Sequence, residues 1–349
     1  MRVVAAVNGW PADDALDPRA AALAVGDAWL EAAPGSSIEA LPVGDGGPRT
    51  ADAWPGERSL VGGAEVVTYG GAAWLAPPHG ASRWNPFDLS AALLGLAAAT
   101  GRVTRAADKF SPAATAPWAS VRGVDEPATV VIPVGDDAPA GDAASLWGGS
   151  LPALRQALRS LDLVAVATSS RPLLGFHGMS ASLIDGREGD VALAKAAQEQ
   201  ERRWTDIARE GDVVASRESL IGPSRLSDRP GTGAAGGLAY ALAALGARIV
   251  PASAYLAEAS GLAAAAATAD LVMGVGADLT PSALDTGVAA SVAAVAARAG
   301  VPATMLSTSV NVGRRDLMAA GLSSAHEAAP GPAGLVDGVR RVAQTWVPR

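Results

Sequence analysis

The chain of 349 residues contains no cysteine. This absence excludes disulfide bonds, zinc–thiolate sites, iron–sulfur clusters and a cysteine nucleophile, and it fits a cytoplasmic protein. Lysine is almost absent as well, since only Lys109 and Lys195 occur and arginine supplies the other cations. No lysine follows a glycine, which excludes the Walker A motif. Arginine can still hold a phosphate or a carboxylate through two parallel hydrogen bonds.

Basic runs and long apolar runs are missing too. The net charge is −8, and an acidic chain without a basic run is not typical of nucleic-acid binding. The most apolar region, residues 256–275, contains Glu258 and Asp270 and much alanine, whereas a membrane-spanning helix needs about 20 strongly apolar residues. The first seven residues are too few for a signal peptide and predict a strand. We expect a small-molecule partner, while the oligomeric state stays open.

Short β-branched runs alternate with alanine-rich stretches along most of the chain. The runs predict strands at residues 2–7, 37–41, 65–69, 73–76, 129–134, 161–168, 212–216, 248–250, 271–275 and 303–307. The stretches predict helices at residues 18–33, 88–99, 150–160, 190–209, 234–245, 252–267, 282–299 and 332–346. Strands separated by helices indicate an α/β fold with parallel sheets. Residues 101–142 are rich in proline, alanine, aspartate and threonine, and we expect a loop-rich lobe or domain connection there.

The segment Pro230-Gly-Thr-Gly-Ala-Ala-Gly-Gly237 is the most informative motif. Glycines before a helix let backbone N–H groups approach an anion, and we expect the segment to bind a phosphate or a carboxylate. The same glycines could instead only permit close packing. We expect Gly233→Val to weaken anion binding with little loss of fold. Gly231-x-Gly233-x-x-Gly236 also fits the dinucleotide fingerprint, but the preceding residues 224–229 are polar and do not predict the strand that the fingerprint requires.

Asp45 lies between glycines directly after a predicted strand. Open α/β sheets bind ligands at the carboxyl ends of their strands, so Asp45 could hold Mg²⁺ or act as a general base. The alternative is a turn in which Asp45 bonds its own backbone.

Arg171 and His177 follow the strand predicted at residues 161–168 and could face an anionic ligand. A Pro/Gly loop with a surface histidine is the alternative. Asn85 could orient a substrate hydroxyl, although a turn before Pro86 needs no function.

Asp278, Thr280 and Ser282 follow another predicted strand and are further polar candidates. Thr280 could simply cap a helix that has Pro281 at its first position.

In this order, the motifs resemble the type I glycerate kinase family of bacteria. Leu41-Pro-Val-Gly-Asp45-Gly-Gly resembles its Leu-Pro-x-x-Asp-Gly-Gly motif, and Arg171-Pro-Leu-Leu-Gly-Phe-His-Gly178 is similar to its Asn-Pro-Leu-Leu-Gly-x-x-Gly loop. Residues 230–238 match its Pro-Gly-x-Gly-Ala-Ala-Gly-Gly-Leu segment almost completely. Residues 271–306 resemble the later strand, loop, helix and strand. The resemblance covers nearly the whole chain.

The resemblance implies a two-domain α/β fold. A Rossmann-like parallel-sheet domain is built from both chain ends, residues 1–69 and 251–349, and a second α/β domain, residues 70–250, is inserted between them. It also implies ATP-dependent phosphorylation of glycerate to a phosphoglycerate, with ATP and Mg²⁺ as cofactors. Asp45 would hold Mg²⁺ or act as the catalytic base. The residues expected to bind phosphate or substrate are Gly231, Thr232, Gly233, Ala234, Gly236, Gly237, Arg171, His177 and Asn85.

Several charged positions depart from the family pattern. Residues 8–12 carry no lysine where the family has Asp-Ser-Phe-Lys-Gly, and Pro48 and Val275 stand where the family has glutamates. Residues 135–142 carry three aspartates in place of a glycine-lined loop. Because a missing phosphate or metal contact can cost orders of magnitude in rate, the alternative is a protein of this fold without turnover that binds a nucleotide or sugar acid as a regulator.

Overall fold

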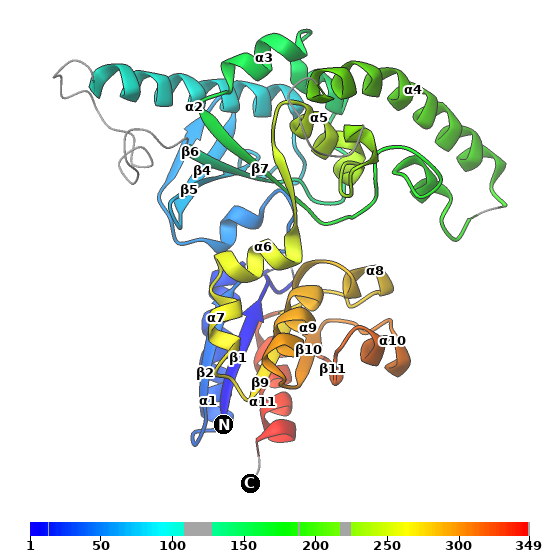
Figure 1. Ribbon diagram of the computed structural model, residues 1–349. Helices are drawn as coiled ribbons and strands as arrows, with labels where there is room; N and C mark the ends of the chain where they lie inside the picture. Colours follow the sequence, from blue (N-terminus) through cyan, green and yellow to red (C-terminus); the bar gives the residue numbers. More distant parts are fainter. Residues whose placement is uncertain (13, 108–127, 188, 217–224, 348–349) are drawn as a thin grey trace. The chain divides into compact units, whose positions relative to one another are not determined.

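The computed structural model describes residues 1–12, 14–107, 128–187, 189–216 and 225–347. The chain forms two compact units, each with its own sheet (Figure 1). Unit 1 comprises Met1–Gly46, Asp52–Pro55 and Ala252–Arg349, and unit 2 comprises Gly47–Ala51 and Gly56–Pro251. The chain thus enters unit 2 near residues 46–56, whereas the sequence places that boundary at 69/70. The physical reason is a β-hairpin, residues 58–69, that pairs with the sheet of unit 2.

Unit 1 contains a five-stranded, fully parallel sheet in the order β11-β10-β9-β1-β2. Its strands are β1 (Arg2–Val7), β2 (Ser37–Pro42), β9 (Leu271–Gly276), β10 (Ala303–Ser307) and β11 (Ser324–Glu327). Its helices are α1 (Pro18–Ala32), α6 (Ala252–Ala259), α7 (Leu262–Ala266), α8 (Pro281–Leu284), α9 (Gly287–Ala299), α10 (Arg314–Ala319) and α11 (Pro332–Trp346). The strand order reverses between β1 and β9, so the carboxyl ends of these two strands flank the position where doubly wound sheets bind ligands.

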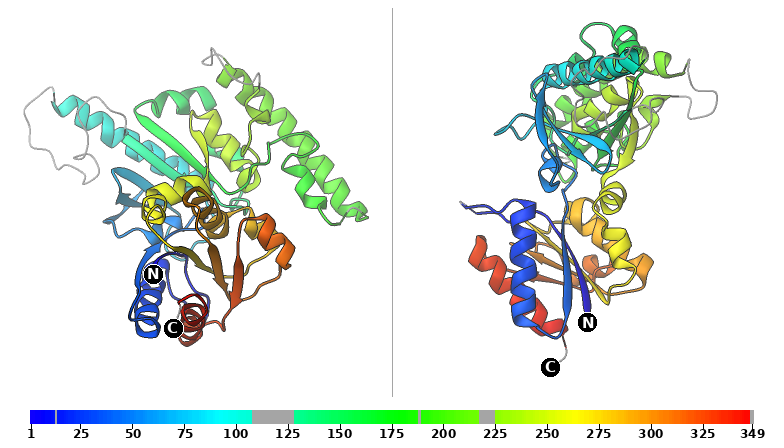
Figure 2. Two further views of the ribbon diagram at one scale, coloured as in Figure 1. Left: turned by 60° about the horizontal axis from the view of Figure 1, so that its bottom comes forward. Right: turned by 90° about the vertical axis from the view of Figure 1, so that its left-hand side faces the viewer.

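Helices cover both faces of the unit 1 sheet (Figure 2). On one face, Val3 and Val275 pack with Val25 of α1 and Val339 of α11. On the other face, a Cβ added to Gly274 would lie 3.2 Å from Cγ2 of Val292 in α9, so this glycine lets α9 approach the sheet. Because both faces are covered, β1 and β9 are apolar without alternation, as buried parallel strands are.

Unit 2 contains a six-stranded mixed sheet in the order β3-β4-β5-β6-β7-β8. Its strands are β3 (Arg58–Val61), β4 (Ala64–Tyr69), β5 (Ala72–Ala76), β6 (Ala128–Pro133), β7 (Leu161–Ala167) and β8 (Arg248–Pro251). Its α-helices are α2 (Pro86–Ala107), α3 (Leu151–Ala157), α4 (Val191–Ser216) and α5 (Leu238–Ala244), and 3₁₀ turns include η3 (Ala143–Trp147), η4 (Ser180–Ile184), η5 (Leu226–Asp228) and η6 (Ala234–Gly237). β5 to β8 are mutually parallel, and β4 is antiparallel to both of its neighbours.

The α/β class predicted from the sequence is confirmed, and most predicted strands are found. The strand predicted at residues 212–216 is wrong, because these residues form the last turns of α4. The buried residues Ala197, Trp204, Ala208 and Gly211 recur at helical spacing, and this period outweighs the β-branched pair at 213–214. Two strands, β3 and β11, and the helix α10 were not predicted.

Three predicted helices begin late or are broken. The helix predicted at 234–245 starts at Leu238, the one at 252–267 is divided by Gly261 with φ +79°, and the one at 282–299 is divided after Leu284. Of the loop-rich region predicted at 101–142, residues 108–127 lie outside the described residues. Residues 101–107 continue α2, and β6 follows from residue 128. No helix among the described residues has the length and apolarity to cross a bilayer.

Candidate functional site

The glycine loop, residues 231–237, lies at the carboxyl end of β7 in unit 2. The Gly231 N–H donates to Ser170 O at 3.1 Å, and the Gly233 N–H donates to Arg171 O at 3.0 Å. Thr232 is fully buried, and its Oγ1 accepts from the Leu173 N–H at 2.8 Å and donates to Arg229 O at 2.7 Å. The loop is therefore fixed by the segment that follows β7.

The backbone of this loop is left-handed over three successive residues. Ala235, Gly236 and Gly237 have φ of 51°, 61° and 89°. Ala235 is the one non-glycine residue with positive φ among the described residues, and such a conformation is costly for an L-residue unless its surroundings hold it. The run delays the helix to Leu238 and turns the chain sharply at the end of the parallel strands.

Packing also requires the glycines of the loop. A Cβ on Gly233 would lie 2.5 Å from Pro172 O, and one on Gly237 would lie 2.4 Å from the Trp204 ring. A Cβ on Gly236 would lie 2.8 Å from Cβ of Ala138. Only Gly236 in the loop is less than fully buried. The packing interpretation therefore holds for these positions, and Gly233→Val would damage the fold, contrary to the expectation from the sequence.

Aspartates surround the segment that covers Gly236. Asp136 accepts a hydrogen bond from the Thr168 hydroxyl, Asp137 forms an ion pair with Arg83 at 3.9 Å, and Asp142 forms one with Arg203. All three aspartates are exposed. In the same region, a Cβ on Gly135 would lie 2.8 Å from Cδ of Pro48, so the proline that replaces the family's glutamate packs on this loop. The loop thus carries negative charge beside the glycines.

The structure gives Arg171, His177 and Asn85 local partners. Arg171 forms an ion pair with Asp185. The exposed His177 ring meets the edge of Phe176 at 4.9 Å between centroids. Asn85 caps α2, because its Oδ1 accepts from the Phe87 N–H at 2.9 Å. Asn85 therefore stabilises the start of α2, and this role agrees with the alternative that the turn before Pro86 needs no function.

In unit 1, Asp45 is exposed and follows β2. A Cβ on Gly287 would lie 3.6 Å from Asp45 O, so the turn that carries Asp45 lies beside the first residue of α9. The amino end of a helix of 13 residues favours negative charge nearby. This placement suits a carboxylate at the edge of the sheet where open α/β folds bind ligands.

Asp278, Thr280 and Ser282 follow β9 at the same edge. Asp278 Oδ1 accepts from the Thr308 hydroxyl at 2.9 Å and the Ser309 hydroxyl at 2.8 Å, which ties the loops after β9 and β10 together. Thr280 accepts from the Ala283 N–H at 3.3 Å as the N-cap of α8, with Pro281 first in the helix. The capping interpretation is confirmed. The Ser282 hydroxyl bonds Thr280 Oγ1 at 3.0 Å.

A buried network that the sequence did not reveal holds the chain before the glycine loop. Asp212 in α4 accepts from the Ser227 hydroxyl at 2.7 Å and from the Tyr240 hydroxyl at 3.1 Å. Burial and the Asp212 carboxylate raise the pKa of Tyr240, so the phenol stays protonated and donates. The sequence predicts a strand at residues 212–216, and in the helix that forms instead Asp212 faces Ser227 and Tyr240.

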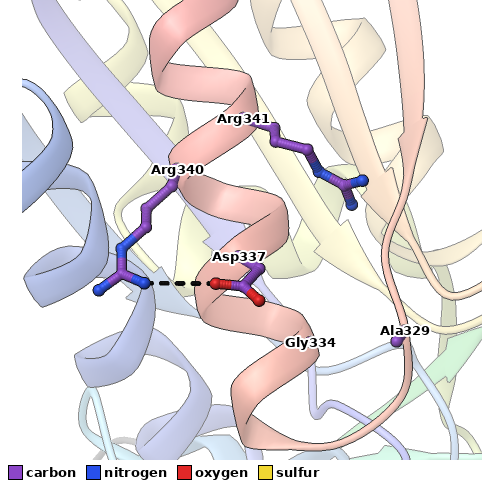
Figure 3. A pocket seen from close by; sticks show the side chains of 5 residues that line it. All are labelled: Ala329, Gly334, Asp337, Arg340 and Arg341. Atoms are coloured by element: carbon purple, nitrogen blue, oxygen red, sulfur yellow. Dashed lines mark hydrogen bonds and ion pairs between the residues drawn. The ribbon is translucent and has the colours of Figure 1, made fainter.

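A pocket of about 480 Å³ lies on α11 of unit 1 (Figure 3). Its lining residues are Ala329, Gly334, Asp337, Arg340 and Arg341. Arg340 pairs with Glu31 at 2.8 Å and with Asp337 at 3.3 Å, and Arg341 donates to Glu327 O at 2.7 Å. The two arginines of the pocket thus already have partners within unit 1. None of the predicted site residues lines the pocket.

No cluster of three or more histidine, aspartate or glutamate residues that could hold a metal occurs in the part of the chain that the structure describes. Mg²⁺ in phosphoryl transfer commonly uses one or two protein carboxylates together with substrate phosphates and water. The exposed Asp45 carboxylate fits that requirement. The described residues do not provide a complete set of protein ligands for a metal.

Residues 142–347 match the profile of the glycerate kinase family. Two uncharacterised proteins, from Mycobacterium bovis and Mycobacterium tuberculosis, are each 29% identical over 275 residues, which cover 74% of this chain. The match spans 66% of each relative, just under two thirds of its length. A crystal structure from Salmonella typhimurium LT2, of a protein proposed to be a glycerate kinase 2, has a TM-score of 0.58 at 18% identity and covers 99% of this chain and 96% of that one. At that identity, the likeness concerns the fold.

Proposed function

The chain belongs to the glycerate kinase family, and on that premise we propose that it phosphorylates glycerate with ATP. A glycerate hydroxyl oxygen attacks the γ-phosphorus, the bond from that phosphorus to the β-phosphate oxygen breaks, and ADP and a phosphoglycerate form. The hydroxyl proton passes to a carboxylate or to solvent. The observation that carries the proposal is the glycine loop, which lies within the family match and is held at the carboxyl end of β7.

In this proposal, Asp45 is the carboxylate of unit 1 that serves the reaction. Its exposure and its place after β2 support a role as general base or as a ligand for Mg²⁺. The metal would neutralise charge on the ATP phosphates. Gly231, Thr232, Gly233, Ala234, Gly236 and Gly237 would shape the anion-binding loop of unit 2. A cytoplasmic location, where ATP is available, belongs to the same proposal.

Release of ADP from Mg-ATP in the presence of D-glycerate tests this function. We expect turnover by the unchanged chain and a loss of at least about 100-fold in kcat for Asp45→Asn, as is typical when a general acid or base is removed. Asp27→Asn is the matched control, because Asp27 is an exposed aspartate on α1. Equal rates for Asp45→Asn and Asp27→Asn would exclude Asp45 from the reaction.

The charges around the glycine loop support a second candidate function, binding without turnover. Asp136 and Asp137 directly precede Ala138, which packs on Gly236. The arginine expected to bind the anion, Arg171, is paired with Asp185. If calorimetry detects binding of ATP or D-glycerate but no ADP is released, this candidate replaces the kinase. If neither ligand binds, both candidates are wrong.

A further inference from the structure

Arg229, directly before Pro230 and the glycine loop, is a partly buried cation without a counter-ion. Its Nε is buried and has no hydrogen-bond partner, and its guanidinium forms no ion pair with any residue that the structure describes. Burying a charge without a partner is costly, so such an arginine favours an anion. Its backbone is firmly placed, because Arg229 O accepts from Thr232 Oγ1 at 2.7 Å.

Two more buried polar atoms near the glycine loop lack hydrogen-bond partners, one on the segment after β7 and one on α4. Ser180 is only 3% exposed, and its hydroxyl has no partner. Glu201 of α4 accepts from the Gly175 N–H at 2.8 Å through Oε1, while its buried Oε2 has none. Native proteins satisfy most buried polar atoms, so three orphans in one region need an explanation.

Hydrogen bonds join these residues into one region, which we call the loop junction (residues 171–180, Glu201 and residues 226–233). The Leu173 N–H donates to Ser227 O at 3.1 Å and to Thr232 Oγ1 at 2.8 Å, and Glu201 holds Gly175. The N–H of Met179, the residue before Ser180, donates to Pro172 O at 3.0 Å and so joins Ser180 to the same segment.

We propose that the loop junction recognises the hydroxy acid: Arg229 binds its carboxylate, and Ser180 and Glu201 bind its hydroxyl groups. This inference rests on the proposed function and names the substrate residues for it. Guanidinium is a donor-only group that suits a carboxylate, and the free Glu201 oxygen can only accept, as a substrate hydroxyl requires. The set therefore suits a ligand with one carboxylate and at least one hydroxyl.

Arg229 thus takes the role that the sequence assigned to Arg171. Arg171 already neutralises Asp185, whereas Arg229 has no such partner among the described residues. Because the unpartnered atoms are buried, part of the loop junction must move for a ligand to reach them.

Titration of the full chain with D-glycerate, followed by calorimetry, tests the assignment. Arg229→Gln should weaken D-glycerate binding by about tenfold or more, as expected for loss of a charge-assisted hydrogen bond, and should leave Mg-ATP affinity within about twofold. Arg202→Gln is the control, because Arg202 is exposed on α4 beside Glu201. If Arg229→Gln does not fold, Arg229→Lys keeps the charge but not the paired donors, and should still weaken D-glycerate binding.

Ser180→Ala separates a ligand site from a structural water site. Removing a buried hydroxyl without a protein partner should leave thermal stability unchanged or higher, while D-glycerate binding weakens. A fall in stability together with unchanged D-glycerate affinity would show that the hydroxyl holds structural water and would overturn the assignment. D-glycerate affinity of Arg229→Gln equal to that of the unchanged chain would also overturn it and leave the kinase proposal intact. If the unchanged chain does not bind D-glycerate at all, the proposed function fails and the assignment fails with it.

Discussion

Gly233 has no space for a side chain. The hypothetical Cβ meets two backbone oxygens, Pro172 O at 2.5 Å and Arg171 O at 3.1 Å, and Cβ of Met179 at 2.9 Å. Backbone cannot move aside as the end of a flexible side chain can. At the scale of single residues, the glycines of the loop are therefore required for packing as well as for exposing the backbone.

Gly233→Val should lower the free energy of unfolding by about 2–3 kcal/mol, as overpacking does. Urea denaturation measures this change. Gly26→Ala is the control, because Gly26 lies within α1 and a Cβ there meets nothing within 4 Å. That variant should gain about 0.5–1 kcal/mol from helix propensity. A neutral result for Gly233→Val would show that the loop adjusts and that packing does not require the glycine.

His326 provides a pH dependence in unit 1. Burial and the charge of Arg341 lower the pKa of His326 from its ordinary value of 6.5. The unfolded chain therefore binds the proton more tightly than the folded chain. The contribution of neutral His326 to the free energy of unfolding is therefore complete above about pH 6.5. It is lost as the pH falls through the pKa of His326 in the folded chain.

In His326→Gln, the free energy of unfolding should fall less between about pH 7 and pH 5 than in the unchanged chain. The difference cannot exceed about 1.4 kcal/mol per pH unit for one proton. Denaturant titrations at a series of pH values measure it. Parallel pH profiles for His326→Gln and the unchanged chain would contradict the assignment to His326.

At the scale of elements, the last turns of α4 organise the return of the chain to the glycine loop. Asp212 accepts from both the N–H and the hydroxyl of Ser227, at 3.0 and 2.7 Å, and from Tyr240 of α5. A Cβ on Gly211 would lie 2.3 Å from the Tyr240 hydroxyl oxygen, so α4 and α5 approach closely here. One carboxylate thus connects α4, η5 and α5.

Asp212→Ala should lower the free energy of unfolding by about 2–3 kcal/mol, because it removes the acceptor for the N–H and the hydroxyl of the buried Ser227. It should also speed amide hydrogen exchange at Ser227. Asp206→Ala is the control, since Asp206 is exposed on the same helix and pairs only with Arg209 among the described residues, at 3.0 Å. Its effect should stay below about 1 kcal/mol. Equal losses in the free energy of unfolding for the two variants would show that the hydrogen bonds of Asp212 contribute no more to stability than an exposed ion pair.

Element types could be predicted better than element boundaries. β1 and β10 were predicted to the residue, because apolar runs between helices are distinctive. The start of α5 was not, because the left-handed run at residues 235–237 depends on Ala138 and Trp204, which are distant in sequence. β11 was missed because its four residues, Ser-Ala-His-Glu, gain strand geometry only by pairing with β10.

At the scale of the whole molecule, the chain builds two sheets of different construction. Unit 1 is doubly wound and fully parallel, with its strand order reversing at β1 and β9, and unit 2 adds an antiparallel hairpin to parallel strands. Each unit has its own buried core. Ligand binding to either unit should therefore be visible as stabilisation of the fold.

D-glycerate should raise the midpoint of thermal unfolding in proportion to the logarithm of its concentration. At 100 times Kd, the stabilisation should reach about 2.7 kcal/mol. Acetate at equal ionic strength is the control ligand, because it has the carboxylate but no hydroxyl. Equal shifts with acetate and D-glycerate would indicate nonspecific anion binding and would contradict recognition of a hydroxy acid.

The sequence by itself determined the α/β class, the family resemblance and the position of the glycine loop, because these depend on local composition and on motif order. It also identified the capping role of Thr280 with Pro281, which is a contact within one turn. The tertiary structure decided which charges already have partners. Arg171 lies 14 residues in sequence from its partner Asp185. The Thr232 hydroxyl accepts a hydrogen bond from the Leu173 N–H, 59 residues away in sequence. Only the folded chain shows that Arg229 buries its Nε without a partner, because burial and counter-ions arise from segments that the sequence leaves far apart.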